Sequence, residues 1–293
     1  MTSEWRTIRA ADFIDFNPRL SLKKGDIATK VAMDKLKPFT KKIPETEKAE
    51  FNGGAKFCNG DTVMARITPC LENGKTAYVD MLDDGEIGFG STEFIVMRAK
   101  TGISDPQFVY YTAINPVFRN VAIKSMVGSS GRQRVQQSVL EELELSVPDL
   151  DEQRRIGDFL ARIDEKIALN DRINDNLEQQ AQSYFQELFV DNADPEWAIG
   201  TISDLGTIVG GSTPSKAKPE YYTESGIAWI TPKDLSINKS KFVSHGENDI
   251  TELGLKNSSA AIMPEGTVLF SSRAPIGYIA IAAGEVTTNQ GFK

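Results

Sequence analysis

One stretch, residues 149–190, constrains the fold of this chain more than any other. Pro148 precedes it, Asp149 is placed to cap a helix, and Glu152 follows three residues later, as in an acidic capping box. After Gly157 the stretch has neither glycine nor proline, so the sequence predicts a helix of roughly ten turns. A helix of that length needs a partner for its apolar face.

The apolar positions of this stretch recur at spacings of three, four and seven residues, which is typical of a coiled coil. The predicted packing positions are Ile156, Leu160, Ile163, Ile167, Asn170, Leu177, Tyr184 and Leu188. Asn170 leaves two interpretations open. A buried asparagine would fix the register and orientation of the partner helix at a cost in stability, whereas an asparagine at a bend would face water.

Composition narrows the class of protein. No apolar run approaches the ~20 residues of a membrane span, and residues 1–5 lack the basic and then apolar pattern of an export signal. We therefore expect a cytoplasmic protein with no membrane partner, in which Cys58 and Cys70 are free thiols. The single histidine, His245, has no cluster of ligand residues near it, and we expect neither a metal nor a cofactor.

Charge is distributed unevenly along the chain. Residues 1–148 hold 20 Lys and Arg against 19 Asp and Glu, residues 149–190 hold 5 against 10, and residues 191–293 hold 8 against 12. Indiscriminate binding to phosphates depends on many basic contacts, so this balance argues against it. Sequence-specific binding through a local patch stays open.

The part before the helix, residues 1–148, predicts one mixed domain. Strands are expected over 61–68, 76–81 and 93–98, and helices are expected to start at Asp105 and Asn115, each of which precedes a proline. The domain contains many lysines between residues 23 and 56, for which a solvated surface is the simplest interpretation.

Landmarks of this domain recur after a polar linker at residues 191–195, as in a diverged duplication. The matched landmarks are Trp5 with Trp197, Thr62 with Thr267, Arg66 with Arg273, and Phe94 with Phe292. The second copy stops at Lys293 without a counterpart of residues 95–190. We therefore expect an α+β protein in which mixed α/β domains are joined by a long helix and the second domain, 191–293, is incomplete.

These features together resemble the DNA specificity subunit of type I restriction-modification systems. The resemblance covers nearly the whole chain and rests on residues 147–156 at the helix start, Tyr184–Phe189 at its end, Gly210–Ser215, Ile227–Ile230, Lys233–Leu235, Ser271–Arg273 and Thr288–Gly291. The recognition parts of this family vary, so they match only at scaffold positions.

The resemblance implies a subunit that performs no chemistry. Residues 1–148 would be one target-recognition domain, residues 149–190 the conserved spacer helix, and residues 191–293 part of a second recognition domain. Each domain would read one half of a bipartite site in double-stranded DNA. Methyltransferase subunits would dock on the assembly and modify adenine, and restriction subunits would join through the complex. A helix of about 40 residues spans roughly 60 Å, comparable with a dozen or more base pairs, so it can fix the half-site separation.

Base readout in the major groove favours Arg or Lys on guanine and Asn or Gln on adenine. By that criterion the candidate DNA-binding residues of the first domain are Arg132, Gln133, Arg134, Arg66 and Lys75, and those of the second are Ser212, Lys216, Lys233 and Arg273. A scaffold role is an equal alternative for each. Because Arg66 and Arg273 occupy matched positions, they also suit a shared salt bridge, and Trp229 is expected in the core.

Two other classes of function deserve comparison. Asn115-Pro116-Val117-Phe118 resembles the Asn-Pro-Pro-aromatic motif of adenine methyltransferases, but the second proline is absent and no glycine-rich cofactor loop precedes it. We interpret it as a helix start. The remaining alternative is a coiled-coil scaffold or regulatory module without DNA sequence specificity. The apolar stripe of residues 156–189 needs a cover, and two hypotheses are open: a second copy of the chain pairs through it, or the methyltransferase partner covers it.

Overall fold

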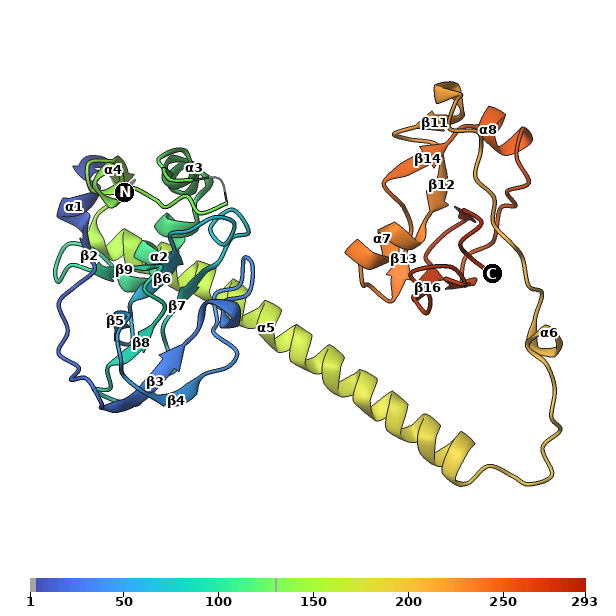
Figure 1. The fold of residues 1–293 in the computed structure, drawn as a ribbon, viewed down its shortest axis with the longest axis horizontal. Coiled ribbons are helices and arrows are strands. Elements are labelled where there is room, and N and C mark those ends of the chain that lie inside the picture. Colours follow the sequence, from blue (N-terminus) through green and yellow to red (C-terminus); the bar gives the residue numbers. More distant parts are fainter. Residues whose placement is uncertain (1–3, 130) are drawn as a thin grey trace. The chain divides into compact units, whose positions relative to one another are not determined.

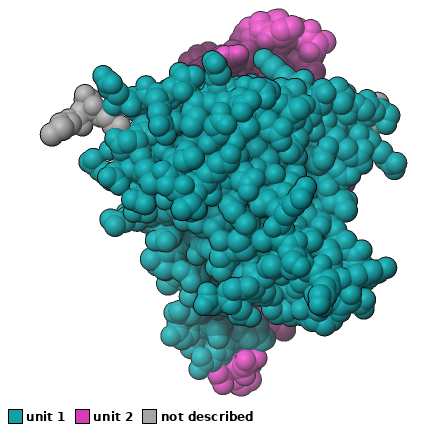
Figure 2. Space-filling model, turned by 90° about the vertical axis from the view of Figure 1, so that its left-hand side faces the viewer, with its two compact units in different colours: residues 1–190 teal, residues 191–293 magenta. Residues whose placement is uncertain are grey.

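The computed structural model describes residues 4–129 and 131–293. The chain forms two compact units, unit 1 over residues 1–190 and unit 2 over residues 191–293 (Figure 1 and Figure 2). Each unit combines small sheets with helices, so the predicted α+β class is confirmed. Residues 1–3 of the expected N-terminal segment and Ser130 of the 128–134 turn lie outside the described residues.

Unit 1 starts with strands and ends with helices. Its strands are β1 (Arg6–Arg9), β2 (Ile14–Phe16), β3 (Ile27–Val31), β4 (Glu47–Glu50), β5 (Ala55–Phe57), β6 (Thr62–Ala65), β7 (Thr76–Tyr78), β8 (Gly88–Gly90), β9 (Phe94–Ala99) and β10 (Glu144–Val147). Its helices are α1 (Ala10–Phe13), the 3-10 helix η1 (Met33–Lys35), α2 (Pro106–Ile114), α3 (Pro116–Lys124), α4 (Gln137–Glu141) and α5 (Leu150–Gln186). The three predicted strands and two predicted helix starts are confirmed, and Asn115 caps α3 by accepting the Val117 N–H at 2.8 Å.

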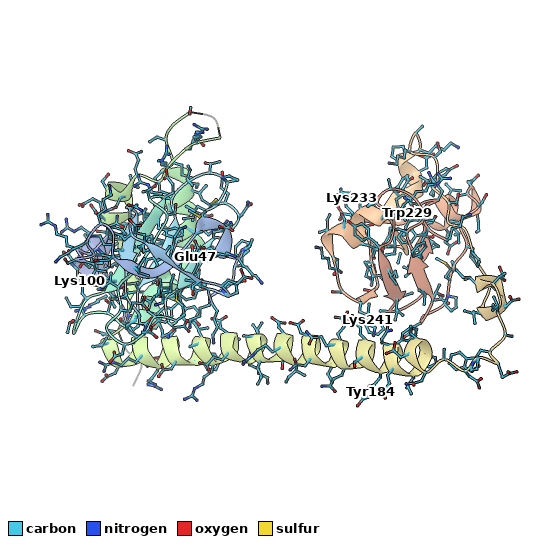
Figure 3. The ribbon with its side chains drawn as sticks, turned by 60° about the horizontal axis from the view of Figure 1, so that its bottom comes forward. Glu47, Lys100, Tyr184, Trp229, Lys233 and Lys241 are labelled. Carbon is cyan, nitrogen blue, oxygen red and sulfur yellow. The ribbon has the colours of Figure 1, made fainter. Side chains whose placement is uncertain are left out.

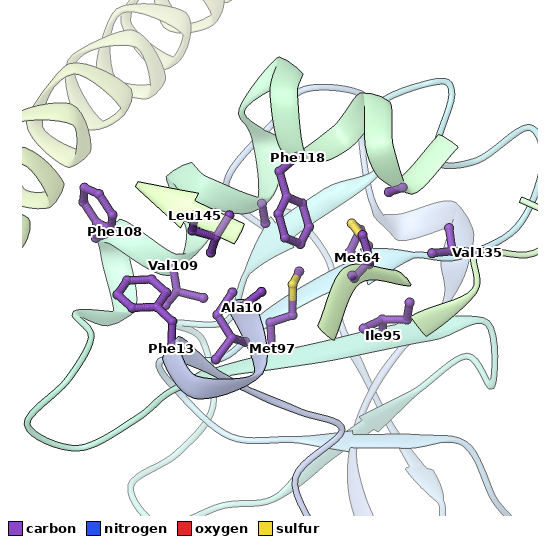
Figure 4. Close-up of a cluster of buried hydrophobic side chains, with 14 of the residues drawn as sticks. Ala10, Phe13, Met64, Ile95, Met97, Phe108, Val109, Phe118, Val135 and Leu145 are labelled. Atoms are coloured by element: carbon purple, nitrogen blue, oxygen red, sulfur yellow. The ribbon is translucent and has the colours of Figure 1, made fainter. Parts of the chain in front are cut away.

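The sheet β2-β9-β6-β7 lies between two cores and is antiparallel throughout. Side chains of a strand alternate between its faces, so Ile95 and Met97 of β9 face one core while Val96 faces the other. Helices α2 and α3 cover the first face with Phe108 and Phe118 (Figure 4). The second sheet, β4-β3-β8-β5, contributes to the other core. A strand buried on both faces explains why β9 is continuously apolar from Phe94 to Met97.

Helix α5 begins as predicted, because the Asp149 carboxylate accepts the N–H of Glu152 at 2.9 Å. Its first turns pack on the rest of unit 1, and Gln153 and Gly157 are buried there. Beyond Asp164 the helix continues (Figure 1) with most of its side chains exposed, and it ends in a π-helical segment, η2 (Glu187–Asp191). Figure 3 shows Tyr184 near this far end.

The predicted packing stripe therefore divides into two parts. Ile156 packs against the first core and Leu160 is half-buried. The other positions are exposed in the described chain: Ile163, Ile167, Asn170, Leu177, Tyr184 and Leu188. Because apolar and polar members are exposed alike, both interpretations of Asn170 stay open.

Unit 2 is made of short elements. Its strands are β11 (Tyr222–Thr223), β12 (Ile227–Ile230), β13 (Phe242–Val243), β14 (Asn248–Ile250), β15 (Val268–Phe270), β16 (Ile279–Ala282) and β17 (Thr287–Thr288). Its helices are α6 (Ile202–Leu205), η3 (Pro219–Tyr221), α7 (Pro232–Ile237) and α8 (Glu252–Lys256). The sheets β11-β14-β12-β17 and β13-β16-β15 enclose a core that includes Ile230, Leu269 and Phe292.

The strand pairings of unit 2 repeat those of unit 1. The parallel pair β3-β8 corresponds to β12-β17, and the antiparallel pair β6-β7 corresponds to β15-β16. The antiparallel partners β4 and β14 also correspond. Two copies of one strand framework explain why the landmark Phe94 recurs as Phe292, because Phe94 pairs with Ala65 at the end of β6 and Phe292 bridges to Ser271 just after β15.

Candidate nucleic-acid interface

In unit 1 the chain after α3 folds back as a hairpin whose described arms are residues 127–129 and 131–134. Val127 and Arg134 close it through two backbone hydrogen bonds of 3.0 and 2.8 Å, and Arg134 also bridges to Ile67, just beyond β6. At Gly128, φ is 140°, a conformation that side chains rarely adopt. The hairpin therefore places the predicted residues Arg132, Gln133 and Arg134 next to the end of β6.

Within this hairpin, Arg132 and Arg134 differ in what they can do. Arg134 donates from Nε and Nη2 to the carboxylate of Glu93 at 2.9 and 2.6 Å. The hydrogen bond from Arg134 lowers the pKa of Glu93, against a smaller effect of burial, and the charge of Arg66 acts in the same direction. Arg132 is exposed and makes no ion pair with any described residue. Arg134 is thus held in place, while Arg132 is free to reach a ligand.

Arg66, Gln133 and Lys75 complete the group at this edge. The Thr68 N–H donates to the carbonyl of Gln133 at 3.0 Å, and Arg66 Nη2 donates to Val135 at 3.4 Å. Lys75 Nζ donates to the backbone carbonyl of Met33 at 2.9 Å, which commits its charge to the scaffold. Among the described atoms, Arg66 Nε and Thr68 Oγ1 are buried without a hydrogen-bond partner. Such orphaned groups are uncommon at buried positions.

In unit 2 the predicted residues surround a concave pocket of about 880 Å³. Its lining includes Lys216, Lys233, Arg273, Trp229 and Gln290. Figure 3 shows Trp229 and Lys233 in this unit. The structure therefore gathers three of the four candidates of the second domain around one cavity, although they come from separate parts of its sequence.

The fourth candidate, Ser212, holds the wall of this pocket. Its N–H donates to the carbonyl of Thr288 at 2.8 Å, and its carbonyl accepts the indole N–H of Trp229 at 3.0 Å. Thr213 donates to Gln290 through its hydroxyl. The segments around Ser212 and Thr288, both part of the family resemblance, are therefore one structural module, and Trp229 is buried as predicted.

The three basic side chains around the pocket differ in whether they form an ion pair. Lys233 pairs with Glu247 at 2.6 Å, and both side chains are exposed, so the pair contributes little to stability. Lys216 and Arg273 make no ion pair in the part of the chain that the structure describes. Two uncommitted cations around one cavity can hold an anion such as a phosphate group.

The predicted equivalence of Arg66 and Arg273 is wrong by one residue. Arg66 N–H donates to the carbonyl of Glu93 at 2.9 Å, and in unit 2 it is Ser272 whose N–H donates to Gly291 at 2.8 Å. The insertion of one residue moves Arg273 to the pocket wall. The shared salt bridge is also wrong, since neither arginine forms one within the described residues.

Two residues at the interface escaped the sequence reasoning. Glu93 orients Arg134, and Gln290 lines the pocket of unit 2. The repeated landmark at Phe94 and Phe292 was the available signal, because both residues lie one or two positions before it. What the sequence could not show is that these segments face the predicted cations.

Other kinds of site are not built in the described residues. No group of three or more His, Cys, Asp or Glu is arranged to hold a metal ion there, and Cys58 and Cys70 are free thiols. Within the same residues, no helix has both the length and the apolar character to cross a membrane.

A family comparison identifies the class of protein that this duplicated framework represents. The model of the type I restriction modification DNA specificity domain matches residues 3–179 and 195–293, and the chain belongs to this family. The fold is similar to that of the type I restriction-modification S subunit from M. genitalium, with a TM-score of 0.51 at 15% identity, over 99% of this chain and 72% of that one.

Curated relatives match in part. The MjaIX specificity subunit of Methanocaldococcus jannaschii is 46% identical over 112 residues, which are 38% of this chain and 26% of that protein. The HindI specificity subunit of Haemophilus influenzae is 23% identical over 79% of this chain and 65% of its own length. The chain thus spans less than two thirds of either relative.

Proposed function

We propose that this chain is a sequence-specific DNA-recognition subunit of a type I restriction-modification complex. Unit 1 up to residue 148 would read one half-site, residues 149–190 would be the spacer, and residues 191–293 would contribute to reading the other half-site. The observation that carries the proposal is that each copy of the same strand framework brings predicted polar residues together: Arg66, Gln133 and Arg134 just beyond β6 in unit 1, and Lys216, Lys233 and Arg273 around one pocket in unit 2.

The role of each group follows from its present partners. Arg132 and Gln133 would read base edges, because the hairpin presents them and Arg132 has no competing ion pair in the described chain. Arg134, held by Glu93, would keep the hairpin in register. In unit 2, Lys216 and Arg273 would contact phosphates or guanine, and Lys233 would assist from the rim.

Partners would supply the chemistry. Methyltransferase subunits would dock on the assembly and modify adenine, restriction subunits would join through that complex, and the chain would act in the cytoplasm. The exposed apolar half of α5 supports a helical partner, since Ile167, Leu177 and Tyr184 are all more than half exposed. A second copy of this chain, paired through this stripe, would cover it.

The test is co-expression of the chain with the methyltransferase subunit encoded beside it, followed by a genome-wide map of methylated adenines. We expect a bipartite motif. Arg132→Ala should relax one half-site and Arg273→Ala the other, while Arg172→Ala, an exposed arginine on α5, should leave the motif unchanged. One half-site repeated in inverted orientation would show that two chains pair and unit 1 alone reads. A complex without any motif would contradict DNA recognition and favour the scaffold alternative.

A further inference from the structure

Helix α5 is fastened to the rest of unit 1 where it crosses α2, and at Gly157 the backbone of α5 lies directly against the start of α2. A Cβ on Gly157 would lie 2.9 Å from both Asp105 Oδ1 and Gln107 Cβ, and 3.2 Å from the backbone nitrogen of Phe108. Atoms of ordinary residues do not approach so closely, so any side chain at this position must push the two helices apart. The crossing therefore depends on glycine.

One turn earlier, Gln153 ties the starts of the two helices together. Its side chain is fully buried, and its amide nitrogen donates to the carbonyls of Pro148 at 3.0 Å and Ile103 at 3.2 Å. Its amide oxygen accepts the N–H of Asp105 at 3.1 Å, and Asp105 itself caps α2 by accepting the Phe108 N–H at 2.9 Å. Every polar atom of this glutamine side chain is thus used to hold the two helix starts together.

Further along, the half-buried Lys41 and Tyr111 of α2 connect to Asp164 of α5. The hydroxyl of Tyr111 donates to Asp164 Oδ2 at 2.5 Å, and Lys41 Nζ donates to the Tyr111 oxygen at 3.1 Å. The same ammonium lies 4.9 to 5.4 Å from the ring centres of Tyr78, Tyr110 and Tyr111, which is the range of cation–π attraction.

Burial lowers the pKa of Lys41, and the nearby Asp164 carboxylate opposes that effect. Burial and the hydrogen bond to Asp164 raise the pKa of Tyr111, so this hydroxyl stays protonated and donates. The cation, the phenol and the carboxylate form a chain that links the sheet, through Tyr78 of β7, to α2 and to α5.

From these contacts we propose that Lys41, Tyr111, Gln153, Gly157 and Asp164 are positioning residues that set the direction of α5 and thereby the distance between the two DNA half-sites. These five residues form what we call the joint between α2 and α5. Only its effect on DNA rests on the proposed function. Beyond Asp164 the helix runs on to Gln186, about 33 Å at 1.5 Å per residue. A change of direction of about 10° would move the far end by roughly 6 Å, nearly two base pairs at 3.4 Å each.

The joint itself is tested by a distance measurement that needs no DNA. In the full chain, with Cys58 and Cys70 replaced by serine, spin labels are placed at the exposed positions Val117 and Asp175. Tyr111→Phe keeps the ring but loses the hydrogen bond to Asp164, and should broaden the distance distribution. Gly157→Ala should shift its mean by about 3–6 Å, because the helices must separate at their crossing.

The control is Asp171→Asn, which makes the same chemical change as Asp164→Asn on the same helix. Among the described residues Asp171 has no side-chain partner, so its substitution should leave the distribution unchanged. If Tyr111→Phe, Asp164→Asn and Gly157→Ala all gave the distribution of the parent chain, the joint would be refuted, whatever the fate of the proposed function.

The effect on DNA is measured separately, on the complex with its methyltransferase. Gly157→Ala and Tyr111→Phe should change or loosen the spacing between the two halves of the methylated motif and leave the half-site sequences intact. An altered distance distribution with an unchanged spacing would overturn the assignment of half-site separation to these residues. Loss of the motif in the parent chain would instead refute the proposed function, while the distance measurement would still decide the joint.

Discussion

The two units use one strand framework but cover the end of β6 and the end of β15 differently. In unit 1, the hairpin at 127–134 pairs with the chain just after β6 and holds Arg134 against Glu93. In unit 2, Arg273, Ala274 and Pro275 of the corresponding segment line an open pocket, and Gly291 stands where Glu93 stands in unit 1. The strand framework therefore fixes where these strand ends lie, whereas the side chains at each end come from the segment that packs over it.

The two units also differ in how well the strands around their cores are covered. In unit 1, β6 lies inside its sheet because β9 pairs along it over four residues, and helices cover the sheet. In unit 2, β15 is the edge strand of its sheet. On its other side, among the described residues, the bridge between Ser271 and Phe292 lies just beyond the strand. Edge strands are protected less well, so we expect unit 2 to exchange its amides faster than unit 1.

The largest expected effect is a loss of stability in unit 1, which tests whether the two units have separate cores. Phe118→Ala removes a ring that is 2% exposed from the first core of unit 1 and should lower the stability of that unit by about 3–5 kcal/mol. Val117→Ala on the same helix, at a side chain that is 71% exposed, serves as the control. Amide hydrogen exchange reads each unit separately. Equal loss of protection in unit 2 would contradict the view that each unit has its own core.

An intermediate effect is expected in unit 2, at the module that forms the pocket wall. A Cβ on Gly211 would lie 2.1 Å from the carbonyl oxygen of Asn289, so Gly211→Ala should destabilise unit 2 by about 1–3 kcal/mol. At Gly206 a Cβ would meet open space, and Gly206→Ala is the matched control. The fluorescence of the buried Trp229 follows the unfolding. If both alanine variants unfolded at the same denaturant concentration, the close packing of this module would be refuted.

The smallest effect is an acid sensitivity of unit 1. Burial by itself would raise the pKa of Glu86, but hydrogen bonds from Lys48, from Thr29 and from the Asp83 N–H lower it to about 2. Because the folded pKa lies below the unfolded value, the stabilisation is present above about pH 4.5 and is lost as the pH falls towards 2.

Glu86→Gln should therefore cost about 0.5–1.5 kcal/mol at pH 7 and little near pH 2. Glu72→Gln, at an exposed side chain of the same unit, is the control. Chemical denaturation at several pH values measures the difference. A penalty that stayed constant down to pH 2 would show that the glutamate acts by shape and not by charge.

Local features were predictable from the sequence because their causes lie within a few residues. The cap at Asp149, the helix starts at Asp105 and Asn115, and the length of α5 all follow from hydrogen bonds between near neighbours. Strand β9 and its buried neighbours followed from apolar patterning, and the duplication followed from repeated landmarks. The choice of Arg132, Arg134 and Arg273 followed from side-chain chemistry alone, and whether they touch DNA stays a prediction.

The sequence by itself determined the long helix, the mixed class of the domains and the family, since each depends on periodicity, capping or order along the chain. Only the tertiary structure decided which residues meet. Glu93 and Arg134 are brought together by strand pairing, and Lys41 reaches Tyr111 because helix α2 packs on the sheet. The one-residue shift between Arg66 and Arg273 was equally invisible, because backbone hydrogen bonds and not residue types set the register.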